Sequence, residues 1–450
     1  MKENQKQHAL QLGLIYPNAA AMDVGSMEMF VAMPVKDGIS EVKTYKAYTE
    51  DMEQLGKDLT AAGVNRIAME ATGVYWMAVY EMLEQQGIAV TLVNARHFKN
   101  TEAQKTDVKD CQWLQQLHAH GLLRASHVAE EKYRQLRTYI HQRGVLQDQK
   151  ADSLNRIHKV LTQMNLKVQH LLSDIEGVSG MIILRQIAAG IHEPERILEK
   201  VDVSLLKAQR SELVKSLKGH YKPHSIEVLR HQLKMYDFVK QQMRVFENLI
   251  ENVLKELLPA DPAGRQPVIA RKTTKVRKNQ YHFNLKEYLK QITQVDLTAV
   301  DGIDEITVLT VLSITGLDLS KWPTAEHFAS WLNLAARPKK TGGKIVGYEK
   351  RFTKNPATQA FRMAAQSLWN SKTSLGYLYR RLALTKGAKK AIKAVARRLA
   401  VIFYHMVRRK VDYDPTIVTE NREIQKEKRI ARIIKEAAKY GFKLTPVPAS

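Results

Sequence analysis

Two long stretches of the sequence carry apolar residues at alternating spacings of three and four. The first runs from Leu154 to Ile175 and the second from Leu229 to Leu257. This spacing places the apolar side chains on one face of a helix, and over this length it predicts a coiled coil or a long helical hairpin. The helices can pack within one chain or join two chains, and we favour an oligomer.

The part of the chain before these helices predicts an α/β unit. Apolar, strand-like runs occur at residues 20–35, 64–70 and 88–95, and helix-like stretches follow the second and third runs. Strands that alternate with helices favour a sheet with crossover helices.

After the helical middle, residues 257–268 contain three prolines and a glycine and are typical of a linker. A basic run follows, and then a second compact region that is mostly helical. The predicted divisions are therefore an α/β domain, a helical or coiled-coil region, a linker with a basic segment, a helical domain and a charged helical tail, at residues 1–130, 131–258, 259–299, 300–415 and 416–450.

The charge balance indicates a polyanionic partner. The 450 residues include 70 Lys and Arg against 46 Asp and Glu, a net charge of +24. Nucleic acid is the commonest polyanion in a cell, although a merely basic soluble protein is the alternative. A single cysteine excludes an intramolecular disulfide framework. Neither a signal core nor an apolar run of about 18 residues occurs, so we expect a cytoplasmic protein without a membrane partner.

Four acids of the α/β part form a candidate metal site. Asp23 lies in the first strand-like run, Glu70 ends the second, and Asp107 and Asp110 stand three apart at the start of a helix, on one face. If the sheet brings all four together, hard cations such as Mg²⁺ or Mn²⁺ would neutralise them, and these ions activate oxygens in phosphodiester chemistry. Each acid alone is more often a solvated or capping residue.

Cations accompany these acids and recur downstream. Residues 386–410 contain nine Lys or Arg and no acid, with apolar residues at helical spacing, which predicts a helix with one buried and one basic face. Near its end, Tyr404 and His405 are best explained by packing. The cations that we expect to face nucleic acid are Arg96, Lys99, Lys105, Lys109, Lys339, Lys340, Lys344, Lys350, Arg351, Lys389, Lys390, Lys393, Arg397 and Arg398.

Two further segments of the second half invite a functional interpretation. A turn at Gly302–Asp304 between helix-like stretches resembles a helix-hairpin-helix, whose amides can hold a DNA phosphate; a plain packing corner is the alternative. The segment "KKTGGK", residues 339–344, is not an ATP-binding P-loop, because Ile345 stands where that motif needs Ser or Thr. Its lysines favour a loop that faces a polyanion.

Several motifs, taken in order, resemble the DEDD transposases of insertion sequences. These motifs are "MDVG", "MEATGVYW", "NARHFKNTEAQKTDVKDCQWL" and the long segment from Gly302 to Lys344. The family is related to Piv-type DNA invertases, and some members are guided by a bridge RNA. The segments "QSLWNSKTSLGYLYRRL" and "AVARRLAVIFYHMV" also resemble its C-terminal domain.

The resemblance implies a RuvC-like, RNase H-type N-terminal domain, a coiled coil and a helical transposase domain. It implies that Asp23, Glu70, Asp107 and Asp110 form the metal-binding DEDD tetrad for Mg²⁺ or Mn²⁺. It also implies DNA as substrate, a structured guide RNA, a homodimer or homotetramer, and a bacterial or archaeal, nucleoid-associated location.

The family also has a nucleophilic serine, and this sequence departs from it there. The matching position is Thr341, which keeps a hydroxyl but adds a methyl that restricts the side chain. Thr341 can be a working nucleophile, the copy can be impaired, or another hydroxyl such as Ser330 or Thr353 can act. A RuvC-like nuclease that uses activated water, and a non-catalytic DNA-binding relative, are the rival functions.

Overall fold

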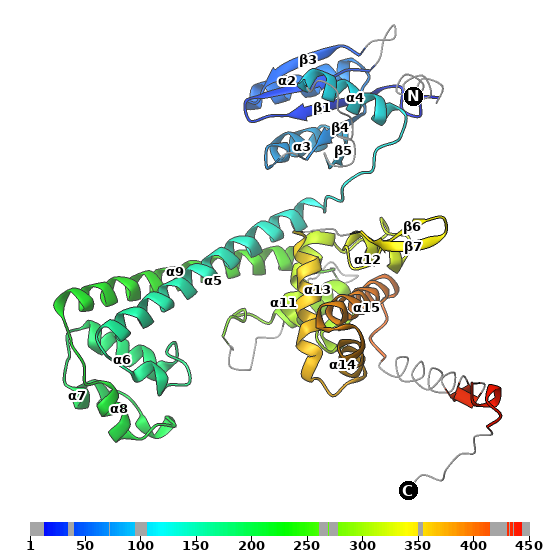
Figure 1. Ribbon diagram of the computed structural model, residues 1–450. Coiled ribbons are helices and arrows are strands. Elements are labelled where there is room, and N and C mark those ends of the chain that lie inside the picture. The colour runs from blue at the N-terminus through cyan, green and yellow to red at the C-terminus, as the bar shows by residue number, and fades with distance from the viewer. Residues whose placement is uncertain are drawn as a thin grey trace. The chain divides into compact units, whose positions relative to one another are not determined.

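The computed structural model describes most of the chain (Figure 1). It divides into two compact units, Met1–Val128 and Ala129–Ser450, which we describe separately. The described residues are 13–34, 40–71, 73–94, 106–260, 269, 278–349, 354–414, 430–431, 433–434 and 436–442.

The first unit contains a mixed five-stranded sheet in the order β3-β2-β1-β4-β5. The first three strands run antiparallel, whereas β4 is parallel to both β1 and β5. The apolar run at residues 20–35 forms two strands, because the chain turns at Gly25, whose N–H donates to the Glu28 carbonyl. The strands are β1 (Ala19–Val24), β2 (Glu28–Ala32), β3 (Val42–Lys46), β4 (Arg66–Glu70) and β5 (Ala89–Val93).

Helices cover both faces of this sheet. Alternate residues of β1 point to opposite faces. Ala20 and Met22 join the apolar cluster that contains α2 (Thr49–Ala61) and α3 (Trp76–Gln85). Ala21 and Ala68 instead pack in a second cluster with Leu114 of α4 (Asp107–Ala119). The predicted α/β organisation is therefore observed.

The second unit begins with two long antiparallel helices that pack side by side (Figure 1). They are α5 (Glu131–Gln163) and α9 (Pro223–Glu256). The long helices predicted for the middle of the chain are present, and they pair within one chain. The first run does not continue as one helix to Ile175: α5 ends before Asn165, which has a left-handed backbone.

The apolar residues beyond α5 pack in a separate small core. Leu166, Val168 and Ile175 join α6 (Val178–Ala188), α7 (Pro194–Leu198) and α8 (Arg210–Ser216) against the distal parts of α5 and α9. A periodic run can thus serve two helical elements, because the spacing predicts only that the residues are buried.

The remainder of the unit is a helical domain with a larger core. Residues 278–299, which were predicted as linker, contain α10 (Leu285–Thr293) and contribute Tyr281, Phe283 and Leu289 to that core. The other elements are α11 (Glu305–Thr315), α12 (Ala325–Trp331), β6 (Pro338–Thr341), β7 (Lys344–Tyr348), α13 (Pro356–Ser367), α14 (Ser374–Lys386) and α15 (Ala388–Arg409).

The turn at Gly302–Asp304 is a packing corner. A single 3₁₀ turn, Leu297–Ala299, stands where a first helix would be needed. A side chain at Gly302 would lie 2.7 Å from the Ala364 carbonyl oxygen of α13, so this turn is pressed against that helix. The Asp304 carboxylate itself accepts the Thr307 N–H at 2.7 Å, which places negative charge where a phosphate would bind.

Of the helices that the structure describes, none combines the length and the apolar composition that a membrane crossing requires.

Candidate functional site: acids at one sheet edge and a hydroxyl on a hairpin

Asp23 and Glu70 lie on neighbouring parallel strands at the same edge of the sheet. Met22 of β1 is paired with Met69 of β4, so each acid is the next residue along its strand. Asp23 is two residues after Ala21, and Glu70 is two residues after Ala68. Because side chains alternate along a strand, both acids point to the same face as these alanines, which is the face that α4 covers. Glu70 is only 5% exposed, whereas Asp23 is half-buried.

The α4 helix is fixed along β1 by polar contacts to the strand backbone. Gln115 Nε2 donates to the Ala19 carbonyl at 3.0 Å, and His118 Nδ1 lies 3.0 Å from the Ala20 carbonyl. One turn earlier, the Cys111 thiol lies 3.3 Å from the Ala21 carbonyl oxygen. The helix thus runs antiparallel to β1, and its first turn lies toward the strand end that carries Asp23.

Burial shapes the chemistry of two α4 side chains. It raises the pKa of the Cys111 thiol to about 12, and this thiol is therefore inert at neutral pH. Burial also lowers the pKa of His118, which favours a neutral ring that donates from Nδ1. Both residues act in packing α4 onto the sheet.

The first turn of α4 carries Asp107 and Asp110. Thr106 is the N-cap, and its hydroxyl accepts the Lys109 N–H at 3.3 Å, so neither Asp107 nor Asp110 is the capping residue of this helix. Asp107 is exposed and Asp110 is half-buried. The fold therefore places the first turn of α4 at the edge, and on the face, that Asp23 and Glu70 share.

The donor set fits a hard divalent cation, because it consists of carboxylate oxygens that would otherwise repel one another. Within the described ranges, no three His, Cys, Asp or Glu side chains form a group that could already hold a metal ion. The topology thus supplies an edge rich in carboxylates, and the side chains do not form a closed ligand sphere.

Thr341 lies in the second unit, in a β-hairpin. The segment expected to be a loop forms strands β6 and β7, which pair antiparallel with Thr341 opposite Lys344. Gly342 and Gly343 have backbone φ angles of +55° and +76°, as a two-residue type I′ turn requires. The Thr341 side chain is exposed.

The sequence contained the signal for this hairpin. A Gly-Gly pair between two extended segments favours a tight hairpin. Strand periodicity could not reveal the strands, because every residue of β6 and β7 except Gly347 is exposed, and the apolar residues Ile345, Val346 and Tyr348 do not alternate regularly with polar ones. The alternative hydroxyl of Ser330 is engaged, since it accepts a hydrogen bond from Arg337 Nη2 at 2.9 Å.

The predicted basic helix is α15, and one of its faces is buried. Val395, Leu399 and Phe403 are completely buried in the larger core, and the Tyr404 hydroxyl donates to the Trp322 carbonyl at 2.6 Å, which confirms its packing role. Of the cations expected to face nucleic acid, the exposed ones that the structure describes are Lys109, Lys339, Lys340, Lys344, Lys389, Lys390 and Arg397.

Lys393 and Arg398 of α15 are half-buried. The expected contacts of Arg96, Lys99, Lys105, Lys350 and Arg351, and the alternative hydroxyl of Thr353, lie outside the described residues.

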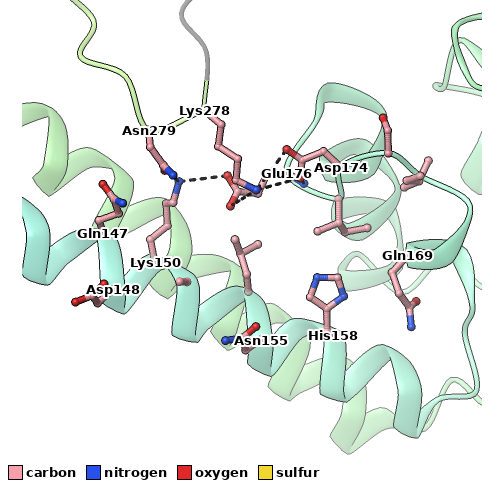
Figure 2. A pocket seen from close by; sticks show the side chains of 15 residues that line it. Gln147, Asp148, Lys150, Asn155, His158, Gln169, Asp174, Glu176, Lys278 and Asn279 are labelled. Atoms are coloured by element: carbon pink, nitrogen blue, oxygen red, sulfur yellow. Dashed lines mark hydrogen bonds and ion pairs between the residues drawn. The ribbon is translucent and has the colours of Figure 1, made fainter. Parts of the chain in front are cut away.

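A cavity of about 410 Å³ lies elsewhere in the second unit, between α5, residues 169–176 and Lys278–Asn279. Figure 2 shows its ion pairs. Glu176 lies 3.2 Å from Lys150 Nζ and 3.3 Å from Lys278 Nζ. None of the predicted site residues lines this cavity. Glu176 thus connects Lys278, at the start of the C-terminal part of the chain, to Lys150 of α5.

Two models of transposase families match the chain. The model of the DEDD transposases of IS110 type matches residues 20–166, which include all four acids. The model described as the transposase IS116/IS110/IS902 family matches residues 296–379, which include Thr341. Together they cover about half of the chain. A search of curated proteins found no match.

Proposed function

Because the chain belongs to the IS110-type family of DEDD transposases, whose domains cleave DNA and transfer strands, we propose that it recombines DNA site-specifically for an insertion sequence. The observation that carries the proposal is the shared position of Asp23, Glu70 and the first turn of α4 at one sheet edge. The strand order, with three antiparallel strands followed by two parallel ones, supports a RuvC-like fold for this unit.

DEDD transposases typically use a divalent metal ion. We propose that Asp23, Glu70, Asp107 and Asp110 hold Mg²⁺ or Mn²⁺, whose contribution when bound is to polarise phosphate oxygens. The four acids would hold the ion at this edge, and Lys109, exposed between Asp107 and Asp110 in the sequence, attracts the DNA backbone to it.

Thr341 is the proposed nucleophile. Its hydroxyl oxygen attacks the scissile phosphorus, the Oγ1–P bond forms, and the bond from phosphorus to the departing 3′-oxygen breaks. The hydroxyl proton passes to solvent, and the 3′-oxygen takes up a proton. A 3′-hydroxyl of another strand then attacks the phosphothreonine and releases the side chain. A strand position suits threonine, because β-branched residues are favoured in extended backbone.

The test is to trap the covalent adduct on DNA that carries the sequences flanking this reading frame. Thr341→Ala should abolish the adduct and Thr341→Ser should retain it, with Lys340→Ala as a control on the opposite face of the hairpin. Asp110→Asn should abolish cleavage. Recombination by Asp110→Asn would refute the metal assignment.

The second candidate is a RuvC-like nuclease or resolvase, which the carboxylate edge would serve equally well. Cleaved DNA without any adduct, unaffected by Thr341→Ala, would support it. The third candidate is a non-catalytic DNA-binding protein related to transposases. It predicts that titration calorimetry finds no Mn²⁺ binding that depends on Asp23 or Asp107.

We also propose a structured guide RNA as a partner. The exposed cations of α15, at Lys389, Lys390 and Arg397, support a second polyanion site outside the hairpin. Purification of the protein from its native host, followed by sequencing of bound RNA, tests this. The proposal predicts one discrete RNA encoded beside the reading frame, and a random pool of cellular RNA would contradict it.

A second apolar stripe on α9 supports self-association into a dimer or tetramer. Val228, Met235, Phe238 and Val245 are all exposed and repeat at spacings of seven, three and seven, on a face that α5 does not cover. This spacing is that of a coiled-coil seam. Phe238→Glu should therefore lower the mass measured by light scattering, whereas Lys240→Glu should not.

A further inference from the structure

The β6–β7 hairpin has two chemically different faces. Paired residues of neighbouring strands point to the same side, and successive residues alternate. The pairing of Thr341 with Lys344 and of Lys339 with Gly347 defines one side, which we call the hydroxyl face. The pairing of Lys340 with Ile345 and of Pro338 with Tyr348 defines the other, which we call the apolar face.

The apolar face has no cover within the described part of its unit. Tyr348 is 61% exposed and Ile345 is 55% exposed, and Val346, the extra residue of a bulge between them, is exposed as well. A two-stranded hairpin that packs on nothing is marginally stable in water. Three large apolar side chains within four residues therefore indicate a partner for this face.

The positive charge around the apolar face indicates which kind of partner binds there. Lys339, Lys340 and Lys344 lie on the hairpin, and its base carries Arg337, whose carbonyl accepts the Glu349 N–H at 2.9 Å. The only acid from 337 to 349 is Glu349. The equally basic hairpin of a second copy would be repelled from this surface, whereas a nucleic acid would be attracted.

The hydroxyl face restricts the partner further, on the premise of the proposed function. If Thr341 meets a phosphodiester, the opposite face of the same ribbon lies beside the adjoining nucleotides. A two-stranded ribbon is narrow enough to enter a DNA groove. Stacked bases present only their edges there, so an apolar side chain gains contact area only where a base is unstacked.

We propose that the apolar face of the hairpin is a wedge, and that Tyr348, flanked by Ile345, stacks on an unstacked base of the DNA strand that Thr341 attacks. The ribbon then serves two purposes at once. The hydroxyl face presents the nucleophile, and the apolar face holds the strand open beside it. This inference rests on the proposed function and assigns a role to Tyr348 and Ile345, which take no part in its bond-making steps.

The test measures DNA binding in EDTA, so that no chemistry is needed. The probes are a single-stranded oligodeoxynucleotide that contains 2-aminopurine and the same strand annealed into a duplex. Tyr348→Ala should weaken single-strand binding about tenfold and reduce the quenching of 2-aminopurine, because one base–aromatic stack is lost. Duplex affinity, dominated by phosphate contacts, should change less than twofold. Tyr348→Phe should behave like the wild type.

Tyr48→Ala is the matched control, since Tyr48 is also 61% exposed and lies in the other unit. Equal binding losses for Tyr48→Ala and Tyr348→Ala would overturn the proposal, as would equal losses on single strand and duplex. A fall in the melting temperature of DNA-free Tyr348→Ala, absent in Tyr48→Ala, would indicate that protein covers this face and would also overturn it.

The two proposals can fail separately. Base stacking is measured without cleavage, and the trapped adduct of Thr341 is measured without reference to Tyr348. An adduct that is lost in Thr341→Ala together with unchanged single-strand binding by Tyr348→Ala would refute the wedge alone.

Discussion

Thr341 stands directly opposite Lys344 across the β6–β7 hairpin, next to the two-glycine turn. The two side chains share a face of the ribbon, so an ammonium group accompanies the proposed nucleophilic hydroxyl. This pairing depends on the hairpin: in an irregular loop, residues three apart have no fixed relation.

Lys344 should therefore assist the reaction at Thr341. Replacing it with alanine should slow adduct formation about fivefold, since a unit cation about 4 Å from a phosphate charge contributes about 1 kcal/mol in water. Lys344→Arg should retain most of the rate. The measurement is the rate of adduct formation at two salt concentrations. Lys340→Ala, on the opposite face, is the control, and an equal loss there would show that the lysines act only through general attraction.

The turn glycines should tolerate only residues that accept a left-handed backbone. Gly342 has a φ of +55° and nothing within 4 Å of the position of an added Cβ, so strain and not crowding decides the outcome. Gly342→Asn, which gives the favoured Asn-Gly turn, should keep adduct formation. Gly342→Val should destabilise the hairpin by about 1–2 kcal/mol or more and reduce adduct formation without lowering the melting temperature. Equal activity of the two variants would contradict the type I′ turn.

Removal of Glu247 should destabilise the pairing of the long helices. Its carboxylate is buried on α9, lies 2.8 Å from Arg143 Nη2 of α5, and also contacts His282 Nδ1 at 2.7 Å. Loss of one partner leaves the Arg143 charge buried, which costs about 3–5 kcal/mol. Urea unfolding of Glu247→Ala measures this loss. Glu256→Ala, which breaks an exposed pair with Lys132 on the same two helices, should change little.

His118 should make the first unit less stable in acid. Burial lowers its pKa in the folded protein, so below about pH 6.5 the unfolded chain binds a proton that the folded one does not. Stability should be complete above that pH and should fall as the pH drops toward the lowered pKa. Urea unfolding at pH 7.5 and 5.5, followed by labelling of the buried Cys111, measures this for the first unit. His118→Gln should reduce the difference between the two pH values, whereas His120→Gln should not.

The sequence predicts the elements of the first unit well because each has a buried face. The apolar residues around Asp23 and Glu70 alternate between two covered sides of the sheet, and Cys111 and Leu114 mark the inner face of α4. The sequence does not predict the register between β1 and β4, which places Asp23 beside Glu70. That pairing depends on packing across more than forty residues of chain.

The hairpin and the pairing of the long helices show two other limits. Periodicity reports a buried face, so it cannot report a strand such as Lys344–Tyr348, in which every residue except Gly347 is exposed. It also identifies that α9 has an apolar side but not which helix covers it. The rhythm from Leu229 to Leu257 is equally compatible with a second chain, and the intrachain partner is set by the return of the chain through α6 to α8.

One end of the α5–α9 pair packs in the larger core, through residues such as Leu136 of α5 and Ile250 of α9. The other end packs in the second, smaller core. With 33 residues at 1.5 Å each, α5 spans about 50 Å, so the pair acts as a spacer of fixed length between two independent cores. Removing seven residues from both helices would shorten this spacer by about 10 Å and keep each helix face nearly in register. Removing them from one helix alone would misalign the Arg143–Glu247 pair. The distance between the two cores can therefore change in steps of two helical turns, while both cores keep their residues.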